Sequence, residues 1–281
     1  MASVKLYVCC HKRSTIPAHK LLVPMQVGRA LAEEGFEGYA SDDTGDHISE
    51  KNRSYCELTA HYWVWKNDAS DFVGFFHYRR YLYPELSPRR AYRLCSVPTV
   101  ELLDTLGYGT FQELIEQTDM ILPCPEEMYV PVREHYATAP WHHGKDLELM
   151  EQILLERHPD YADAMERYLS GTQHFFGNIF IMRRRVFEEY CSWLFPLLEE
   201  FDARVDTTGY SPQELRVDGY LAERLLGIYY EKNRTRWTVQ LLPRVHFYGL
   251  DGGAHAGERL RYILLPPGTK RRAEVKRWAR S

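Results

Sequence analysis

The sequence has 281 residues, of which 44% are hydrophobic and 26% charged, and its formal net charge is −4. This length and composition predict a globular protein with a sizeable core. Domains that bind nucleic acid are usually basic, so the negative charge argues against an extended nucleic-acid surface. No nucleic-acid partner is therefore expected.

The cysteines and the apolar runs bear on the compartment. The six cysteines are scattered and form no C-x-x-C pair, which favours free thiols in a reducing compartment over a zinc site or a disulfide framework. The opening MASVKLYVCC is too short and too quickly polar for a signal peptide, and no apolar run approaches the roughly 20 residues that span a bilayer. We therefore expect a cytoplasmic protein.

The first predicted elements are a strand, a short helix and a loop. The apolar run within residues 4–12 predicts a strand that ends at His11 and Lys12. Residues 24–35 end at a glycine and predict a short helix, whereas the Asp-rich stretch 41–49 predicts a loop. Polar side chains thus follow directly after the first strand.

A helix and a second strand come next. Ser54 and Glu57 form a capping-box pattern, and apolar residues at helical spacing then predict a helix over 54–67. The stretch DFVGFFHYRRYLYP, residues 71–84, begins as a buried strand and then runs into His77 and two arginines. A buried strand that ends on such polar groups points to a functional edge of the sheet.

Helices and strands alternate through the rest of the chain. Helices are predicted over 100–117 with a break near Gly107, over 185–201 and over 211–233, and one helix followed by another is predicted within 146–170. Strands are predicted over 119–125, 174–184 and 237–249, and loops over 84–98 and 132–146. This alternation predicts a single α/β domain with a mostly parallel central sheet and helices on both faces. In such sheets the ligand lies outside the carboxyl ends of the strands.

Four long stretches carry a resemblance to a known family. They are DDTGDHISEKNRSYCELTAHYWVWKN, DFVGFFHYRRYL, GNIFIMRRRVFEEYCSWLFPLL and GYLAERLLGIYY, in matching order between Val4 and Tyr230. They resemble the motifs of the capsular and exopolysaccharide biosynthesis family, formerly a domain of unknown function, which is associated with bacterial galactofuranosyltransferases. The resemblance implies a GT-A-type glycosyltransferase.

The resemblance also implies a division of the chain and an activity. A single GT-A-like domain would cover residues 1–265, with a donor-binding half over about 1–125, an acceptor half over about 126–265 and a basic tail over 266–281. The implied activity transfers a hexose, with UDP-galactofuranose as the expected donor, to a capsule or O-antigen glycan with inversion. The acceptor is either free or lipid-linked. The alternative is a non-catalytic component of a polysaccharide assembly complex that binds a nucleotide sugar or a glycan.

His77, Arg79 and Arg80 stand where GT-A enzymes usually carry an Asp-x-Asp motif that holds a divalent cation. A diphosphate leaving group needs its developing charge neutralised by a metal ion or by cationic side chains. The planar fork of arginine suits this task because it can bind two phosphate oxygens. We therefore predict that these residues replace the metal, so that no cofactor is favoured. In the structural alternative the arginines form surface ion pairs and the histidine belongs to the core.

A metal-dependent alternative remains open. Asp43 and Asp46 lie around a glycine in the loop 41–49, where they could accept hydrogen bonds from ribose or sugar hydroxyls, or hold Mn²⁺ or Mg²⁺. His246 lies in a late strand, and some GT-A enzymes use a C-terminal histidine as a metal ligand. The structural alternatives are an Asp-rich turn and a core histidine.

Five further residues are candidates for the donor site. His11 follows the first strand, Asn52 and Lys66 lie at the two edges of one family motif, and Asn178 is a buried amide that needs hydrogen-bond partners. Glu57 is the fifth, although the capping box already explains a glutamate at its position.

Transfer with inversion needs a carboxylate to take the proton of the acceptor hydroxyl. The candidates are Glu223 and Asp218, which lie five residues apart and thus about 140° around a helix. Both can hardly face one active site. Glu223 is preferred because it lies within a family motif, whereas Asp218 stands where the family more often has another residue. The structural alternative for Glu223 is an ion pair with a neighbouring basic residue.

Two further segments have predicted partners. His135, Tyr136 and Trp141 lie in the predicted loop 132–146, where the aromatic rings could stack on an acceptor sugar beneath a mobile lid. The C-terminal tail carries basic residues around Trp278, which could contact an anionic membrane surface from the cytoplasmic side. A frayed, solvated terminus is the alternative. These basic residues are Lys270, Arg271, Arg272, Lys276, Arg277 and Arg280.

Overall fold

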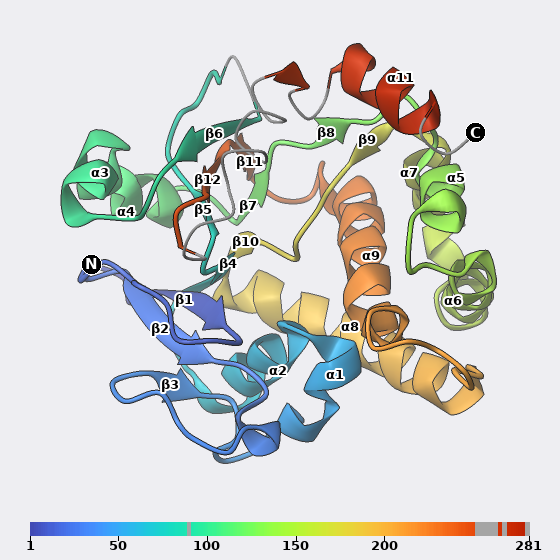
Figure 1. The fold of residues 1–281 in the computed structure, drawn as a ribbon, viewed down its shortest axis with the longest axis horizontal. Helices are drawn as coiled ribbons and strands as arrows, with labels where there is room; N and C mark the ends of the chain where they lie inside the picture. Colours follow the sequence, from blue (N-terminus) through green and yellow to red (C-terminus); the bar gives the residue numbers. More distant parts are fainter. Residues whose placement is uncertain (89–90, 251–263, 266–268, 279–281) are drawn as a thin grey trace.

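A ten-stranded sheet runs through the molecule, with helices packed around it (Figure 1). The structure is a computed structural model, and it describes residues 1–88, 91–250, 264–265 and 269–278. None of the helices within these residues is both long enough and apolar enough to cross a membrane.

The main path of the sheet has the strand order β11-β7-β10-β4-β1-β2-β3. Its strands are β1 (Val4–Cys10), β2 (Leu22–Gln26), β3 (Ala40–Ser41), β4 (Phe72–His77), β7 (Met120–Pro123), β10 (Phe180–Arg183) and β11 (Val239–Leu242). Strands β4, β1, β2 and β3 run parallel to one another, as do β7 and β11, whereas β10 is antiparallel to both of its neighbours. The predicted α/β fold with a mostly parallel central sheet is therefore confirmed.

A branch of three strands leaves the main path after β4. Strand β5 (Arg80–Leu82) follows β4 after a tight turn and pairs with it. On its other side β5 pairs with β12 (Arg244–Phe247), and β12 also pairs with β6 (Tyr92–Cys95). The predicted loop 84–98 thus contains a strand. A separate two-stranded sheet joins β8 (Glu126–Glu127) to β9 (Gln173–His174).

The helices fall between these strands in chain order. The α-helices are α1 (Asn52–Tyr55), α2 (Leu58–Asn67), α3 (Val100–Thr105), α4 (Tyr108–Glu116), α5 (Val132–Thr138), α6 (Gly144–Arg157), α7 (Ala162–Ser170), α8 (Arg184–Arg204), α9 (Val217–Asn233) and α11 (Lys270–Trp278). The 3₁₀-helices are η1 (Arg29–Leu31), η2 (Ser49–Lys51), η3 (Pro159–Tyr161) and η4 (Glu214–Arg216). The predicted break near Gly107 is confirmed, because this glycine adopts φ 88° between α3 and α4.

The apolar residues form two layers, one on each face of the sheet. Tyr7 and Phe75 belong to the layer that includes residues of α2, α8 and α9, whereas Leu6 and Phe76 belong to the layer with α3 and α4. Neighbouring residues of a strand point to opposite faces, so β1 and β4 read as nearly continuous apolar runs. Position 74 of β4 requires a glycine, because an added Cβ would come within 2.7 Å of a side-chain carbon of Leu6.

Two predicted helical features are wrong. Residues 24–35 form the end of β2 and the short η1 instead of a helix, because Pro24 to Gln26 pair with β1 as a buried parallel strand. The capping box is not formed either. The Ser54 hydroxyl donates to Asp218 on α9, and the Glu57 side chain makes no capping hydrogen bond.

The third difference concerns the predicted loop 132–146. Most of it is helical, since α5 covers its first half and α6 begins at Gly144. The side chains of Val132, His135 and Tyr136 are buried, which gives α5 an apolar face. The segment 132–146 is therefore mostly helical rather than the predicted loop.

Candidate functional site

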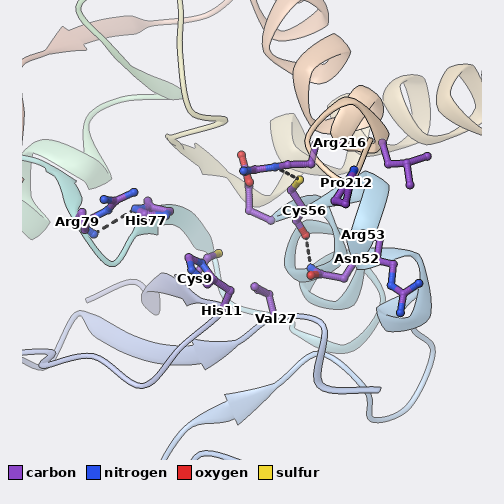
Figure 2. A pocket seen from close by; sticks show the side chains of 12 residues that line it. Cys9, His11, Val27, Asn52, Arg53, Cys56, His77, Arg79, Pro212 and Arg216 are labelled. Atoms are coloured by element: carbon purple, nitrogen blue, oxygen red, sulfur yellow. Dashed lines mark hydrogen bonds between the residues drawn. The ribbon is translucent and has the colours of Figure 1, made fainter. Parts of the chain in front are cut away.

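A cavity of about 490 Å³ lies where β1, β2 and β4 end (Figure 2). Cys9 at the end of β1, Val27 just after β2 and His77 at the end of β4 contribute to its wall. This is the edge of the sheet where the chain connectivity of α/β proteins predicts a ligand. The complete lining is Cys9, His11, Val27, Asn52, Arg53, Cys56, Glu57, His77, Arg79, Pro212, Leu215 and Arg216.

A turn between α1 and α2 forms the opposite wall. Cys56 adopts φ 52° and ψ −127°, a conformation that costs energy for any residue with a Cβ. The turn is held by Asn52, whose Nδ2 donates to the Cys56 carbonyl at 2.6 Å, and by Arg216, whose Nε donates to Cys56 Sγ at 3.2 Å. Helix α9 approaches so closely that a Cβ on Gly219 would lie 3.1 Å from Cys56 Sγ. The cavity wall thus joins segments about 160 residues apart in the sequence.

The cavity is rich in basic side chains, although the whole chain is acidic. Its cationic and imidazole side chains are His11, Arg53, His77, Arg79 and Arg216. Among the lining residues in the part of the chain that the structure describes, Glu57 is the one carboxylate. Such a concentration of basic groups favours an anionic ligand with phosphate or carboxylate oxygens.

His77 is neutral in this environment. Burial lowers the pKa of His77 well below its ordinary value, and the charges of Arg80 and Arg79 lower it further. The backbone N–H of Arg79 donates to Nδ1 of His77 at 3.2 Å, so the proton of the neutral ring is on Nε2. The positive charge at the end of β4 therefore comes from the arginines, and His77 can act only as a hydrogen-bond donor through Nε2.

The two arginines of the predicted cluster diverge. Arg79 lines the cavity, and its guanidinium lies 5.3 Å from the ring centre of Tyr78. Arg80 lies on β5, where a Cβ on Gly177 would come within 3.5 Å of its Nη1. Its side chain is therefore beside Gly177 rather than among the lining residues, while His11 does line the cavity.

The aspartates after β3 serve different purposes. Asp42 is buried and accepts hydrogen bonds from the backbone N–H groups of Gly28 and Arg29 at 2.8 and 3.0 Å. Asp43 accepts a bond from Ser41, and Asp46 is exposed. Neither Asp43 nor Asp46 is among the lining residues of the cavity. Asp42 therefore ties its loop to the segment that follows β2, 13 and 14 residues away in the sequence, which is a structural role.

Lys66 and His246 also lie away from the cavity lining. Lys66 is exposed on α2, with its ammonium 3.5 Å from the centre of the Trp65 ring. His246 lies on β12 with its ring 5.2 Å from that of Tyr92, and burial lowers its pKa well below the ordinary value. Asn52, by contrast, is part of the cavity wall.

The proposed metal ligands do not come together. Asp43 follows β3 and His246 lies on β12, and the strands β2, β1, β4 and β5 separate them in the sheet. Strands are spaced about 4.8 Å apart, so one cation cannot bridge the two residues. Within the described residues there is also no group of three His, Cys, Asp or Glu side chains that could hold a metal ion. The donor set present therefore does not fit a GT-A metal site built on this pair.

Asn178 is bonded directly to Glu57. It lies just before β10, is only 2% exposed and adopts φ 46°. Its Nδ2 donates to Glu57 Oε1 at 2.8 Å and to the carbonyl of Gly219 at 3.0 Å. Burial raises the pKa of Glu57, and the hydrogen bond from Asn178 offsets part of that rise.

The two carboxylates predicted to be the base are outside the cavity lining. Glu223 accepts from the backbone N–H of Gly177 through Oε1 at 2.6 Å and from Arg224 through Oε2 at 2.6 Å, which is the ion pair considered as its structural alternative. Asp218 is 1% exposed and accepts from the Ser54 hydroxyl. Burial raises the pKa of Asp218 to about 7, and the nearby charge of Asp202 adds to the rise.

The three predicted acceptor residues differ in their exposure to solvent. Tyr136 is fully buried, with the guanidinium of Arg224 5.0 Å from its ring centre, and His135 is buried against His174. Trp141 is 57% exposed and adopts φ 66°. Of these three residues, Trp141 alone presents an aromatic face to solvent.

The basic tail is described in part. Helix α11 contains Lys270, Arg271 and Arg272, and the Arg272 guanidinium donates to the carbonyl of Leu265 at 3.3 Å. Arg280 lies outside the described residues. The boundary between residues 265 and 266 also adjoins undescribed residues, so the division into a domain and a tail stays a prediction.

Sequence reasoning missed Cys56, Arg216 and the neighbours of Arg216. Cys56 falls in the middle of a predicted helix, and neither glycine nor proline marks the break there. Arg216 falls at the start of another predicted helix that sequence does not connect to the sheet edge. The contact between them depends on tertiary structure alone.

Comparisons with known proteins match the family and the fold of this chain. The family described as "Domain of unknown function (DUF4422)" matches residues 5–234. The apo structure of the WbbM bifunctional glycosyltransferase aligns with a TM-score of 0.83 and 32% sequence identity. The alignment covers 88% of this chain and 46% of that one, so this chain spans about half the length of its structural relative. No curated protein matches the sequence.

Proposed function

Because the chain belongs to the DUF4422 family, we propose that it is a glycosyltransferase that binds a nucleotide sugar in the cavity at the ends of β1, β2 and β4. The observation that carries the proposal is the basic wall of this cavity at the ligand edge of the sheet. A relative with 32% identity that is described as a glycosyltransferase supports the reaction class.

The diphosphate of the donor binds beside Arg79 and Arg216. As the bond to the sugar breaks, negative charge grows on the leaving diphosphate, and preorganised cationic groups stabilise it. Arginine can hold two phosphate oxygens at once, and neutral His77 can donate one further hydrogen bond from Nε2. We propose that these side chains do the work that a divalent cation does in other enzymes of this type.

The donor-binding half is assigned to about residues 1–125. Nine of the twelve lining residues come from this half, and the three others lie between Pro212 and Arg216. The proposed donor is UDP-galactofuranose, transferred with inversion to a glycan of capsule or O-antigen, free or lipid-linked. Support for this sugar and this acceptor comes from the family resemblance.

The acceptor glycan is assigned to the side of the cavity near Arg216. Its guanidinium lies 5.8 Å from the ring centre of Tyr220, and the Tyr220 ring stacks on His142 at 4.1 Å. Exposed Trp141 precedes His142, so an aromatic surface leads away from the cavity. Aromatic faces pack well against the C–H surfaces of sugars.

Ligand-dependent thermal stability tests the proposal. A ligand that binds only the folded chain raises its melting temperature, so UDP and UDP-galactofuranose should stabilise the protein with or without Mn²⁺. Arg79→Ala and Arg216→Ala should each weaken UDP binding about tenfold or more, since hydrogen bonds to charged groups contribute roughly 1.5–3 kcal/mol. Arg93→Ala, an exposed arginine on β6, is the control.

Release of UDP in the presence of a synthetic galactoside then separates the two candidate functions. Transfer of the sugar supports the enzyme. Binding of the donor without transfer or hydrolysis supports the non-catalytic component of an assembly complex. Absence of binding by any UDP-sugar contradicts both.

A further inference from the structure

The proposed transfer leaves the catalytic base unassigned, because the two expected carboxylates are engaged elsewhere. Both oxygens of Glu223 accept hydrogen bonds, one from a backbone N–H and one from Arg224. Asp218 is buried against Ser54. Neither residue is among those that line the cavity, so neither is in position to meet an acceptor hydroxyl there.

We propose that Glu57 is the catalytic base of the proposed glycosyltransferase and that Asn178 is its positioning residue. Glu57 lies at the start of α2 and is the one carboxylate among the described lining residues of a cavity that is otherwise basic. A base must reach the hydroxyl that it deprotonates, and Glu57 lines the cavity in which the proposed donor and acceptor meet. The inference rests on the proposed function and assigns a residue to it.

The transfer step moves one proton and exchanges one bond at the anomeric carbon. Glu57 takes the proton of the acceptor hydroxyl while the oxygen of that hydroxyl forms a bond to the anomeric carbon of the donor sugar. The bond between the anomeric carbon and the diphosphate oxygen breaks, and the nucleotide diphosphate leaves with the electron pair. Arg79 and Arg216 stabilise the charge that develops on it. Glu57 then releases its proton to solvent.

Asn178 fixes the orientation of the Glu57 carboxylate. Its two hydrogen-bond partners, Glu57 Oε1 and the carbonyl of Gly219, are both acceptors, so the amide must present its NH₂ group to them. The backbone of Asn178 adopts a positive φ of 46°, a left-handed conformation that asparagine tolerates better than most residues. A local backbone constraint therefore supports the hydrogen bond to the proposed base.

The surroundings of Glu57 raise its pKa above the ordinary value of a glutamate. Burial raises the pKa of Glu57 and the charge of Glu223 raises it further, whereas Asn178 and Arg216 lower it. The base is active when deprotonated, so activity should fall as the pH drops through a pKa above the ordinary value of a glutamate. Titratable groups within electrostatic reach of Glu57 are Glu223, Tyr220, Arg216, Cys56 and Cys9.

Parallel carboxylate-to-amide variants test the assignment. With UDP-galactofuranose and a synthetic galactoside, Glu57→Gln should lower kcat by about 10²–10⁴-fold, the usual contribution of a general base. UDP binding and melting temperature should stay close to wild type. Glu223→Gln and Asp218→Asn should retain most of kcat. Glu113→Gln, an exposed carboxylate on α4, is the matched control.

Two further variants separate a catalytic role from a structural one. Formate should restore part of the turnover of Glu57→Ala, because it can supply a carboxylate to the space that the side chain leaves. Asn178→Gly keeps the left-handed backbone available and removes the amide. It should move the acid limb of the kcat/KM profile to higher pH, since the hydrogen bond that lowers the pKa of Glu57 is lost.

The outcomes are distinct. If wild type transfers sugar and Glu57→Gln does so within about tenfold, the assignment of Glu57 is wrong although the proposed function stands. A large loss of kcat confined to Glu223→Gln or Asp218→Asn also overturns the assignment of Glu57 as the base. If wild type acts on no UDP-sugar, the proposed function fails and the assignment falls with it.

Discussion

Asp218 is a buried carboxylate that joins two helices. Its Oδ2 accepts from the Ser54 hydroxyl of α1, while Asp202 of α8 places a second negative charge nearby. The other oxygen, Oδ1, is buried and has no hydrogen-bond partner among the described residues. A carboxylate in such surroundings is easier to keep in its protonated form, so its raised pKa carries a cost for folding at neutral pH.

The variant Asp218→Asn should stabilise the protein at neutral and higher pH. An unfolded aspartate has a pKa near 3.9, whereas in the folded chain the pKa of Asp218 is raised to about 7. Between these values the folded state holds a proton that the unfolded state has released, so wild-type stability falls as pH rises through this window. Asparagine does not titrate and avoids this loss.

Urea unfolding at pH 5 and pH 8 measures the effect. The gain from Asp218→Asn should be larger at pH 8, on the order of 1 kcal/mol or more. Glu113→Gln, exposed on α4, should show no such pH dependence. An equal or smaller gain at pH 8 contradicts the account of Asp218 as a buried, proton-binding carboxylate.

The turn at Cys56 is an element boundary that could not be predicted from the sequence. The predicted helix over 54–67 is split into α1 and α2, because Cys56 leaves the helical region with φ 52°. Contacts with Asn52 and Arg216 hold this conformation. The helical periodicity was correct for α2, but the break depends on a partner 160 residues away that no local pattern indicates.

Two variants at position 56 measure the strain in this turn. Cys56→Ala and Cys56→Gly both remove the thiol and its contact with Arg216, and they differ only in the Cβ. A residue with a Cβ in this conformation costs about 1–3 kcal/mol, whereas glycine adopts it freely and loses less than about 1 kcal/mol through unfolded-state entropy. Cys56→Gly should therefore unfold at higher urea than Cys56→Ala, and the reverse order would falsify the assignment of strain.

The sequence predicted that a ligand would bind at the carboxyl ends of the strands, where the cavity lies, but it did not predict all the residues of the cavity wall. The apolar runs within 4–12 and 71–84 predicted strands correctly, and both β1 and β4 end at the cavity. Arg216 could not be predicted as a lining residue, because only the packing of η4 and the following α9 against α1 brings it to the sheet edge. The roles of Glu223 and Asp218 stayed undetermined for the same reason, since helical spacing does not reveal which side chains reach a cavity.

The distribution of charge in the chain favours sugar transfer without a metal ion. The net charge is −4, yet three arginines and two histidines line one cavity beside a single carboxylate among the described lining residues. Asp43, which follows β3, and His246 on β12 are separated in the sheet by four strands. Since positive charge is built into the wall, donor binding and sugar transfer should persist in excess EDTA.

The measurement is UDP release with EDTA and then with added Mn²⁺. Turnover in EDTA should stay within about twofold of its value in Mn²⁺, because the arginines already neutralise the diphosphate. It should fall with increasing salt, since added ions screen the attraction between the basic wall and the donor. Loss of turnover in EDTA with recovery in Mn²⁺ would contradict this prediction. It would mean that the donor binds together with a cation that its diphosphate oxygens hold, with few ligands from the protein.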